Sequence, residues 1–260
     1  MRKAEILILS GVGINAESEL ERGFRDAGAL VSTILLEEFL KDPGMLLKYN
    51  IFALPGGFSF GDEVRSGKIL AEKMRSSLSG YWDAFLSKRG LVLGICNGFQ
   101  VLMQLGVFEN RNRINKETKR TITLNTNNHG EFRNFWTELE ITSAGLKTPW
   151  FKNCNREITL PVRHKEGKIL CAVDHQGIST MPEDMKVVLK YKKNINGSLE
   201  NIAGVVDLSG QILGLMPHPE VALESFLHPL FPDLESYENT STIKKFFTNA
   251  IHFAEGSYHE

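Results

Sequence analysis

The fold is decided by one stretch, Leu91-Val92-Leu93-Gly94-Ile95-Cys96-Asn97-Gly98-Phe99-Gln100. Its first five residues form a continuous apolar run, which is typical of a strand buried on both faces of a parallel sheet. A helical pattern begins at Asn97 and continues to Leu105, so Cys96 alone separates strand from helix. The stretch therefore predicts a sharp strand–turn–helix elbow with Cys96 at its apex.

Strand and helix signals alternate along the first hundred residues around this elbow. Apolar runs and helical patterns occur at 5–10, 16–27, 30–36, 50–54 and 69–86, and Gly80 interrupts the last of these. Such alternation predicts an α/β fold, with a mostly parallel sheet covered by helices on both faces. We expect residues 1–260 to form a single domain, because no linker rich in Pro, Gly and Ser divides the chain.

The second half of the chain no longer alternates strand and helix signals. Short apolar runs at 121–124, 139–142, 158–162, 168–173 and 187–191 predict additional β-strands, which either extend the sheet or form a lobe over it. A last strand is expected at 211–216. A helical pattern closes the chain at 242–254.

Composition narrows the classes of function. The 260 residues carry a formal net charge of −1, which does not predict a nucleic-acid or anionic-membrane partner. No apolar run reaches the length of a membrane-spanning helix, and the run at 6–9 is too short for a signal peptide. The three cysteines are odd in number and widely spaced, so neither a disulfide framework nor a zinc site is expected. These features favour the cytoplasm.

The elbow has the chemistry of a nucleophile. Gly94 and Gly98 stand two residues either side of Cys96, where larger side chains would collide in so tight a turn. The turn presents the thiol at the carboxyl end of the sheet, where ligands bind in open α/β folds, and the following helix amino terminus favours the thiolate. A lone cysteine in such a unit is more often part of the core, but the glycines favour a nucleophile.

A second motif, Met216-Pro217-His218-Pro219-Glu220, supplies a base at the end of the last predicted strand. His218 can take and return the thiol proton, and Glu220 can hold the other ring nitrogen. Alone, this motif would be an ordinary surface turn. Together with Cys96 it predicts a Cys-His-Glu triad.

A third motif, Pro55-Gly56-Gly57, follows the predicted strand at 50–54. Acyl transfer creates an oxyanion that backbone N–H groups stabilise well. We expect Gly57 and Asn97 each to donate one N–H, and a side chain at position 57 to obstruct the substrate. Alone, the Pro-Gly-Gly turn is weak support for this role.

Together these residues resemble the class I glutamine amidotransferases, through Gly94-x-Cys96-x-Gly98-x-Gln100, Pro55-Gly56-Gly57 and His218-Pro219-Glu220. Within that family the match is nearest to the glutaminases of phosphoribosylformylglycinamidine synthase. The segments that carry this narrower match are 55–62 with Arg65, 94–100, 194–198, 202–205 and 215–220. The resemblance extends from about residue 6 to residue 222.

The resemblance implies a flavodoxin-like fold and hydrolysis of L-glutamine, with the ammonia passed to a synthetase subunit in de novo purine biosynthesis. ATP and Mg²⁺ are then expected on that synthetase and no cofactor on this chain, and a small bridging subunit is a further expected partner. Gln100 lies one helical turn after Cys96 and is the first candidate for binding the α-groups of glutamine. The resemblance suggests Asn196, Gly197 and Ser198 as the second contact. The histidines show no metal-ligand spacing.

The chain departs from the family pattern at three places. Ala16 stands where the family often has cysteine, Val221 where it often has arginine, and 164–167 reads His-Lys-Glu-Gly instead of His-Gly-Glu-Gly. Two interpretations of His164 and Glu166 remain open: an acid–base pair, or a polar loop near the site.

Three alternatives stand beside this interpretation. In the first, the chain is a glutaminase for another synthetase, such as those that make CTP or GMP. In the second it is a cysteine hydrolase or chaperone of a related fold, and in the third a catalytically silent regulatory subunit. The segment 58–62, together with the residues around Cys96, argues against the first. Asn97 argues against the second, because a hydrolase of that kind places histidine close after the cysteine. The intact triad argues against the third.

Overall fold

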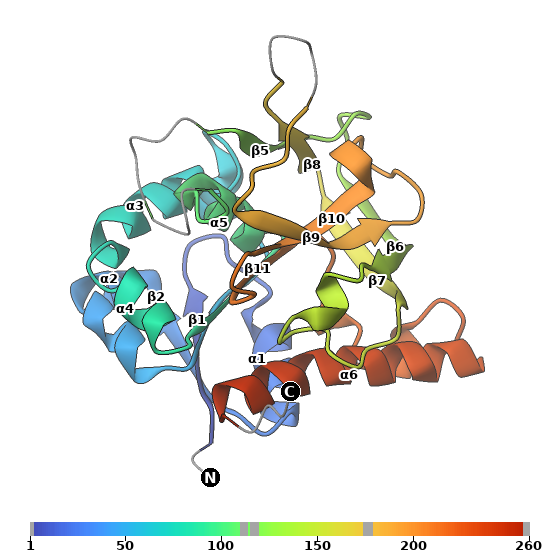
Figure 1. Cartoon of the computed structure of the whole chain (residues 1–260), viewed down its shortest axis with the longest axis horizontal. Coiled ribbons are helices and arrows are strands. Elements are labelled where there is room, and N and C mark those ends of the chain that lie inside the picture. Colours follow the sequence, from blue (N-terminus) through green and yellow to red (C-terminus); the bar gives the residue numbers. More distant parts are fainter. Residues whose placement is uncertain (1–2, 110–113, 115–119, 174–178, 257–260) are drawn as a thin grey trace.

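A computed structural model describes residues 3–109, 114, 120–173 and 179–256 (Figure 1). Within this part of the chain, nine strands form one sheet in the order β2-β1-β3-β4-β11-β10-β9-β6-β7. The parallel strands are β1 (Glu5–Ser10), β2 (Leu30–Leu35), β3 (Ile51–Leu54), β4 (Leu91–Ile95) and β11 (Ile212–Leu215). The antiparallel extension comprises β10 (Ile202–Asp207), β9 (Met185–Tyr191), β6 (Arg133–Ile141) and β7 (Glu157–His164). The predicted parallel sheet with added strands in the second half is confirmed.

A separate two-stranded sheet pairs β5 (Ile122–Thr126) with β8 (Glu166–Cys171) and lies at one end of the molecule (Figure 1). β8 follows β7 after a single residue, so the chain turns from the large sheet into the small one at Lys165. This corner brings residues 163–166 beside the carboxyl end of β4, where the elbow is.

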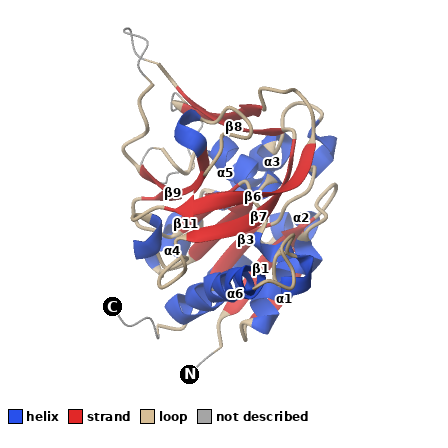
Figure 2. Ribbon diagram, turned by 90° about the vertical axis from the view of Figure 1, so that its right-hand side faces the viewer, coloured by secondary structure: helices blue, strands red, loops and turns tan. Residues whose placement is uncertain are grey.

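Helices cover both faces of the large sheet (Figure 2). α1 (Glu17–Asp26) and α6 (Leu234–Ala254) pack against each other, and the rings of Phe24 and Phe247 meet edge to face at 5.2 Å. α5 (Asn97–Leu105) packs against β3 and β4, and α3 (Lys68–Leu78) packs on α5. The smaller helices are α2 (Leu36–Lys41) and α4 (Trp82–Ser87). Among the described residues, no helix combines the length and the hydropathy needed to cross a membrane.

Several elements differ from the sequence prediction, among them α2, which was not predicted, and β6, which begins at Arg133 instead of 139; β10 and α6 show why. β10 was not predicted as a strand, because Gly204 interrupts its apolar pattern; a Cβ there would lie 2.5 Å from Leu215 Cδ2, so the close approach of β11 requires glycine. α6 begins at Leu234 instead of residue 242, because its first two turns are largely polar and show no apolar periodicity.

Candidate active site

The turn between β4 and α5 holds Cys96 in a strained backbone conformation, with φ 50° and ψ −106°. A non-glycine residue adopts positive φ only where the surrounding structure enforces it. Here the enforcement comes from close packing: a Cβ at Gly98 would lie 1.9 Å from the Leu54 carbonyl oxygen, and one at Gly94 would lie 2.7 Å from the Gly98 oxygen. The glycines therefore let α5 begin directly against β3 and β4, which confirms the predicted reason for them.

β11 pairs in parallel with β4 and brings the second motif to the elbow. Leu215 lies opposite Ile95, and the Cys96 N–H donates to the Leu215 carbonyl at 2.7 Å. The chain then continues through Met216 to His218, whose Nδ1 lies 2.6 Å from Glu220 Oε1. The pairing of β4 with β11 thus brings Cys96 and His218 together, although they are far apart in the sequence.

Charge at this site is concentrated on His218. Burial lowers its pKa, but the charges of Glu220 and Cys96 outweigh this effect and raise the pKa to about 10. Because Nδ1 faces Glu220, the proton exchanged with the thiol is the one on Nε2, which has no hydrogen-bond partner among the described residues. The arrangement favours an imidazolium ring at neutral pH.

The two predicted oxyanion donors come from the loop after β3 and from the first turn of α5. Gly57 has φ 147°, and a Cβ there would lie 2.5 Å from the Gly13 carbonyl oxygen. The backbone of residues 13–15, instead of the substrate, is therefore the first obstacle to a side chain at position 57. Asn97 is the first residue of α5, where a backbone N–H has no intrahelical acceptor.

The side chain of Asn97 has a function that the sequence did not predict. Its Oδ1 accepts from the Ser59 N–H at 3.1 Å, and its Nδ2 donates to Asp62 at 3.3 Å and to Gln100 Oε1 at 2.9 Å. It is buried, so these bonds are costly to lose. Asn97 therefore ties the loop that carries Gly57 to the helix that carries the nucleophile.

A cavity of about 480 Å³ opens over the thiol. It is lined by Gly57, Phe58, Asp62, Ser66, Cys96, Gln100, Thr126, Phe132 and residues 163–166. Its volume falls in the usual range for small-molecule sites. Of the predicted substrate contacts, Gln100 lines it, and the Gln100 Nε2 donates to the Glu166 carbonyl.

Asn196, Gly197 and Ser198 do not line this cavity. Asn196 Nδ2 donates to the Gly167 carbonyl at 2.9 Å, and Ser198 Oγ accepts from the Ile169 N–H at 3.0 Å. Both side chains are buried behind β8. The structure thus places Asn196 and Ser198 where they hold the β8 backbone, whereas the Gly197 N–H donates to Asn194 Oδ1.

β7 and β9 contribute to the site in ways that the sequence did not predict. The Arg163 carbonyl accepts the Cys96 thiol at 3.5 Å, and the Pro161 carbonyl accepts the His218 N–H at 2.9 Å. Burial and the Cys96 charge raise the pKa of Tyr191. The apolar pattern predicted strands here, but strand order in the sheet depends on long-range pairing that no local pattern records.

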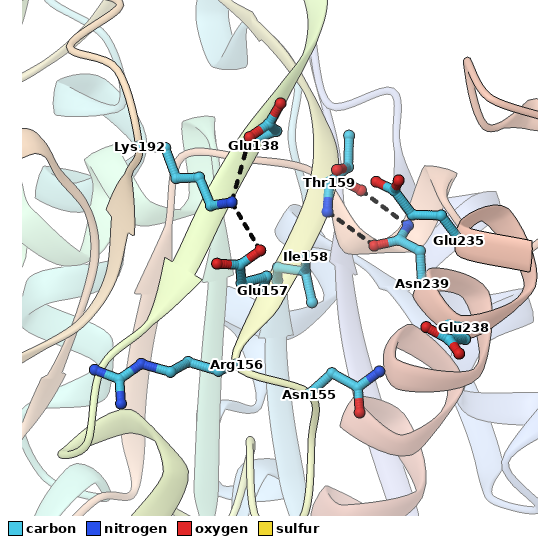
Figure 3. Close-up of a pocket in the computed structure, with 10 residues that line it drawn as sticks. All are labelled: Glu138, Asn155, Arg156, Glu157, Ile158, Thr159, Lys192, Glu235, Glu238 and Asn239. Atoms are coloured by element: carbon cyan, nitrogen blue, oxygen red, sulfur yellow. Dashed lines mark hydrogen bonds and ion pairs between the residues drawn. The ribbon is translucent and has the colours of Figure 1, made fainter.

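A second cavity, of about 400 Å³, lies between β6, β7 and α6 (Figure 3). Its charged groups pair with one another: Lys192 Nζ donates to Glu157 at 2.7 Å and lies 3.4 Å from Glu138. Asn239 is bonded to the Thr159 backbone in both directions, at 2.8 and 3.0 Å. None of its lining residues is a cysteine or histidine, so the first cavity is the better candidate for an active site. The described residues contain no cluster suited to a metal ion.

Comparison with known proteins agrees with this assignment. The family model for the CobB/CobQ-like glutamine amidotransferase domain matches residues 3–254. Phosphoribosylformylglycinamidine synthase subunit PurQ of Dehalococcoides mccartyi is 34% identical over 259 residues, covering 98% of this chain and 99% of that protein. The protein of the same name from Methanococcus maripaludis is 33% identical over 237 residues, covering 86% of this chain and 85% of its own length.

Solved structures agree in fold. A chain in the structure of PurLQS from Thermotoga maritima matches with a TM-score of 0.69 and 28% identity, covering 94% of this chain and 99% of that one. A glutamine amidotransferase from Thermotoga maritima matches with a TM-score of 0.55 over 98% of this chain and 100% of its own, and at 17% identity it supports the fold alone. From the family match and the curated relatives together, this chain belongs to the CobB/CobQ-like glutamine amidotransferase family.

Proposed function

We propose that this chain is the glutaminase subunit of phosphoribosylformylglycinamidine synthase. It hydrolyses L-glutamine to glutamate and ammonia and passes the ammonia to an ATP-dependent synthetase subunit in de novo purine biosynthesis. The observation that carries the proposal is that the Cys96 elbow meets His218 and Glu220 at the carboxyl ends of two adjacent parallel strands. His218 Nδ1 and Glu220 Oε1 lie 2.6 Å apart. The names of the relatives support the choice of synthase.

In the mechanism that this geometry supports, the Cys96 thiolate attacks the side-chain amide carbon of glutamine. The N–H groups of Gly57 and Asn97 stabilise the oxyanion. His218 gives its Nε2 proton to the departing ammonia and then takes one from the water that cleaves the glutamyl thioester. Glu220 holds Nδ1 throughout, so the ring keeps the orientation that both steps need.

Substrate binding is assigned to two sets of residues. Gln100 lines the cavity and supports the wall that faces the α-groups of glutamine. Asn196 and Ser198, on either side of Gly197, act on the same wall by fixing the backbone of β8. ATP and Mg²⁺ belong to the synthetase partner, and a small bridging subunit completes the assembly. With three free cysteines, the chain suits a reducing cytoplasm.

Reconstitution with the synthetase subunit of the same organism tests this function. The complex is expected to form formylglycinamidine ribonucleotide from glutamine, ATP and formylglycinamide ribonucleotide, with one glutamate released per product. Ammonia release without product would instead indicate a glutaminase for another synthetase, such as one that makes CTP or GMP. No glutamine hydrolysis in an assembled complex would contradict the proposal and favour a regulatory subunit.

Thiol reactivity provides a second prediction. A chloroketone analogue of glutamine should label Cys96 alone, because burial raises the pKa of Cys154 to about 12 and that of Cys171 to about 11. Peptide mass spectrometry of the labelled chain measures this directly, and glutamine should protect. The matched control is Cys96→Ala, which should take up no label. Dominant labelling of Cys154 or Cys171 would contradict the assignment of the nucleophile.

A further inference from the structure

The wall of the Cys96 cavity contains two carboxylates that compete for one hydroxyl. Ser66 Oγ lies 3.1 Å from Asp62 Oδ2 and 3.3 Å from Glu166 Oε2. A serine hydroxyl has one proton to donate, so it cannot satisfy both carboxylates at the same time. Ser66 is buried, and both acids line the cavity. At any time one of the two carboxylates is therefore short of the Ser66 proton, although Asp62 also accepts from Asn97 Nδ2 and from the Gly67 backbone.

Glu166 shows the same shortage at its other oxygen. Oε1 is buried and has no hydrogen-bond partner among the described residues. The nearest cation, Arg65, places its Nε 3.7 Å away and is 41% exposed, so it balances the charge only in part. Burial raises the pKa of Asp62, and burial with the Asp62 charge raises that of Glu166. The wall thus carries two acids close together, and one of their oxygens, Glu166 Oε1, lacks a hydrogen-bond donor among the described residues.

His164, in the same cavity, has the opposite shortage. Asn127 Oδ1 accepts from the Gly167 N–H at 3.1 Å, so the Asn127 amide nitrogen is the group that faces His164 Nδ1, also at 3.1 Å. Nδ1 must then accept, and the ring proton lies on Nε2. That donor has no partner in the described part of the chain, although His164 is only 3% exposed.

His164 is a fixed donor and not an acid–base catalyst. Burial, with the charges of His218 and His129, lowers its pKa to about 3, so the ring stays neutral at neutral pH. Of the two interpretations that the sequence left open, the acid–base pair with Glu166 does not fit this environment. A neutral buried N–H in the wall of a cavity, with no partner among the described residues, is suited to donate to a bound group.

The elbow helix fixes this wall in place. Asn97 Nδ2 donates to Asp62 Oδ1 at 3.3 Å, and the Gln100 side chain bonds the Glu166 backbone. Both donors belong to the first turn of α5, directly after Cys96. The carboxylates therefore stand at a set position relative to the thiol.

We propose that Asp62 and Glu166 bind the α-ammonium group of the amino-acid substrate, and that His164 Nε2–H donates to its α-carboxylate. The proposal rests on the glutaminase function above and adds how the zwitterion is recognised. An α-ammonium supplies a donor for Glu166 Oε1 and a positive charge beside the two acids, and an α-carboxylate supplies the acceptor that His164 Nε2 lacks in the described part of the chain. The acceptor at Glu166 and the donor at His164, both unpartnered among the described residues, thus match the α-ammonium and the α-carboxylate of one amino acid.

The test compares L-glutamine with glutaramate, which has hydrogen in place of the α-ammonium group. In the reconstituted complex, the wild type should prefer glutamine in kcat/KM by at least about 100-fold, because a hydrogen bond to a charged group contributes roughly 10- to 100-fold. Asp62→Asn and Glu166→Gln should each lower kcat/KM for glutamine about 10-fold or more, mainly through KM. Glu166→Gln, which leaves the Asn97–Asp62 bond in place, should not lower kcat/KM for glutaramate by more than about twofold, so the preference shrinks.

The matched control is Glu63→Gln, which removes an exposed carboxylate next to Asp62 and should leave both substrates unchanged. Glutamine α-amide, in which an amide replaces the α-carboxylate, tests His164 in the same way. His164→Ala should lower kcat/KM for glutamine more than kcat/KM for the α-amide. Equal losses for glutamine and glutaramate would show a structural role and overturn the proposal. So would a wild type that uses both substrates equally well, a result that needs no variant to fold.

The test separates the recognition proposal from the function beneath it. A wild-type complex that hydrolyses glutamine without preferring it to glutaramate contradicts the ammonium site alone. A complex that hydrolyses neither substrate contradicts the glutaminase function, and the ammonium site with it.

Discussion

Replacing Cys96 with alanine should abolish glutamine-dependent synthesis in the complex and leave ammonia-dependent synthesis unchanged. The loss should be roughly 10⁵-fold or more, as for other nucleophiles that act within a triad. The fold should survive, because the elbow depends on Gly94 and Gly98, and alanine at φ 50° is no more strained than cysteine. Product formation is measured with glutamine and with ammonium salts, at the same pH.

The comparison of nitrogen sources separates the two half-reactions. The wild-type complex, assayed in parallel, should use both sources. Loss of both activities in a correctly assembled variant would show that the chain does more than supply ammonia. Retention of both would remove Cys96 from the mechanism.

The second large effect is expected at His218. His218→Ala should lower the glutaminase rate by roughly 10⁵-fold, and Glu220→Gln by about two orders of magnitude less, because the orienting acid of a triad costs less to remove than its base. Single-turnover rates of glutamate release measure both. Thermal unfolding confirms that each variant is folded. Wild-type rates in both folded variants would disprove the triad.

The Glu220 variant also has a pH signature. The raised pKa of His218 stabilises the fold fully below about pH 6.5, its ordinary value, and this contribution is lost as pH rises through about 10. Glu220→Gln removes the charge that most raises that pKa. The alkaline loss of stability should therefore be smaller in the variant, and the alkaline limb of its pH–rate profile should move to lower pH.

The elbow could be predicted from sequence because its determinants are local. A continuous apolar strand, a cysteine and a helix pattern lie within fifteen residues, and α5 begins and ends at the predicted residues, Asn97 and Leu105. Gly106, in the left-handed conformation with φ 81°, terminates the helix where the pattern stops. The glycines of the elbow were likewise predictable, because tight turns limit side-chain size.

The walls of the cavity could not be predicted in this way. Asp62, Ser66 and Glu166 meet only because β8 turns away from β7 and its first residue, Glu166, reaches Gln100 of α5, and no local pattern specifies that placement. The same holds for the Arg163 carbonyl beside the thiol. Backbone groups carry no residue signature, so sequence reasoning finds the nucleophile and its base more readily than the wall around them. Residues 110–113 and 115–119 lie outside the described part of the chain.

The adjacency of β4 and β11 also sets an order of events during biosynthesis. β11 begins 212 − 95 = 117 residues after β4 ends, so a nascent chain exposes β4 as an unpaired, wholly apolar edge for much of its translation. Such edges are where partly made chains aggregate, and a chaperone would have to protect this one. The same delay means that a ribosome-bound fragment has the thiol but neither His218 nor Glu220. An unfinished chain therefore cannot consume glutamine.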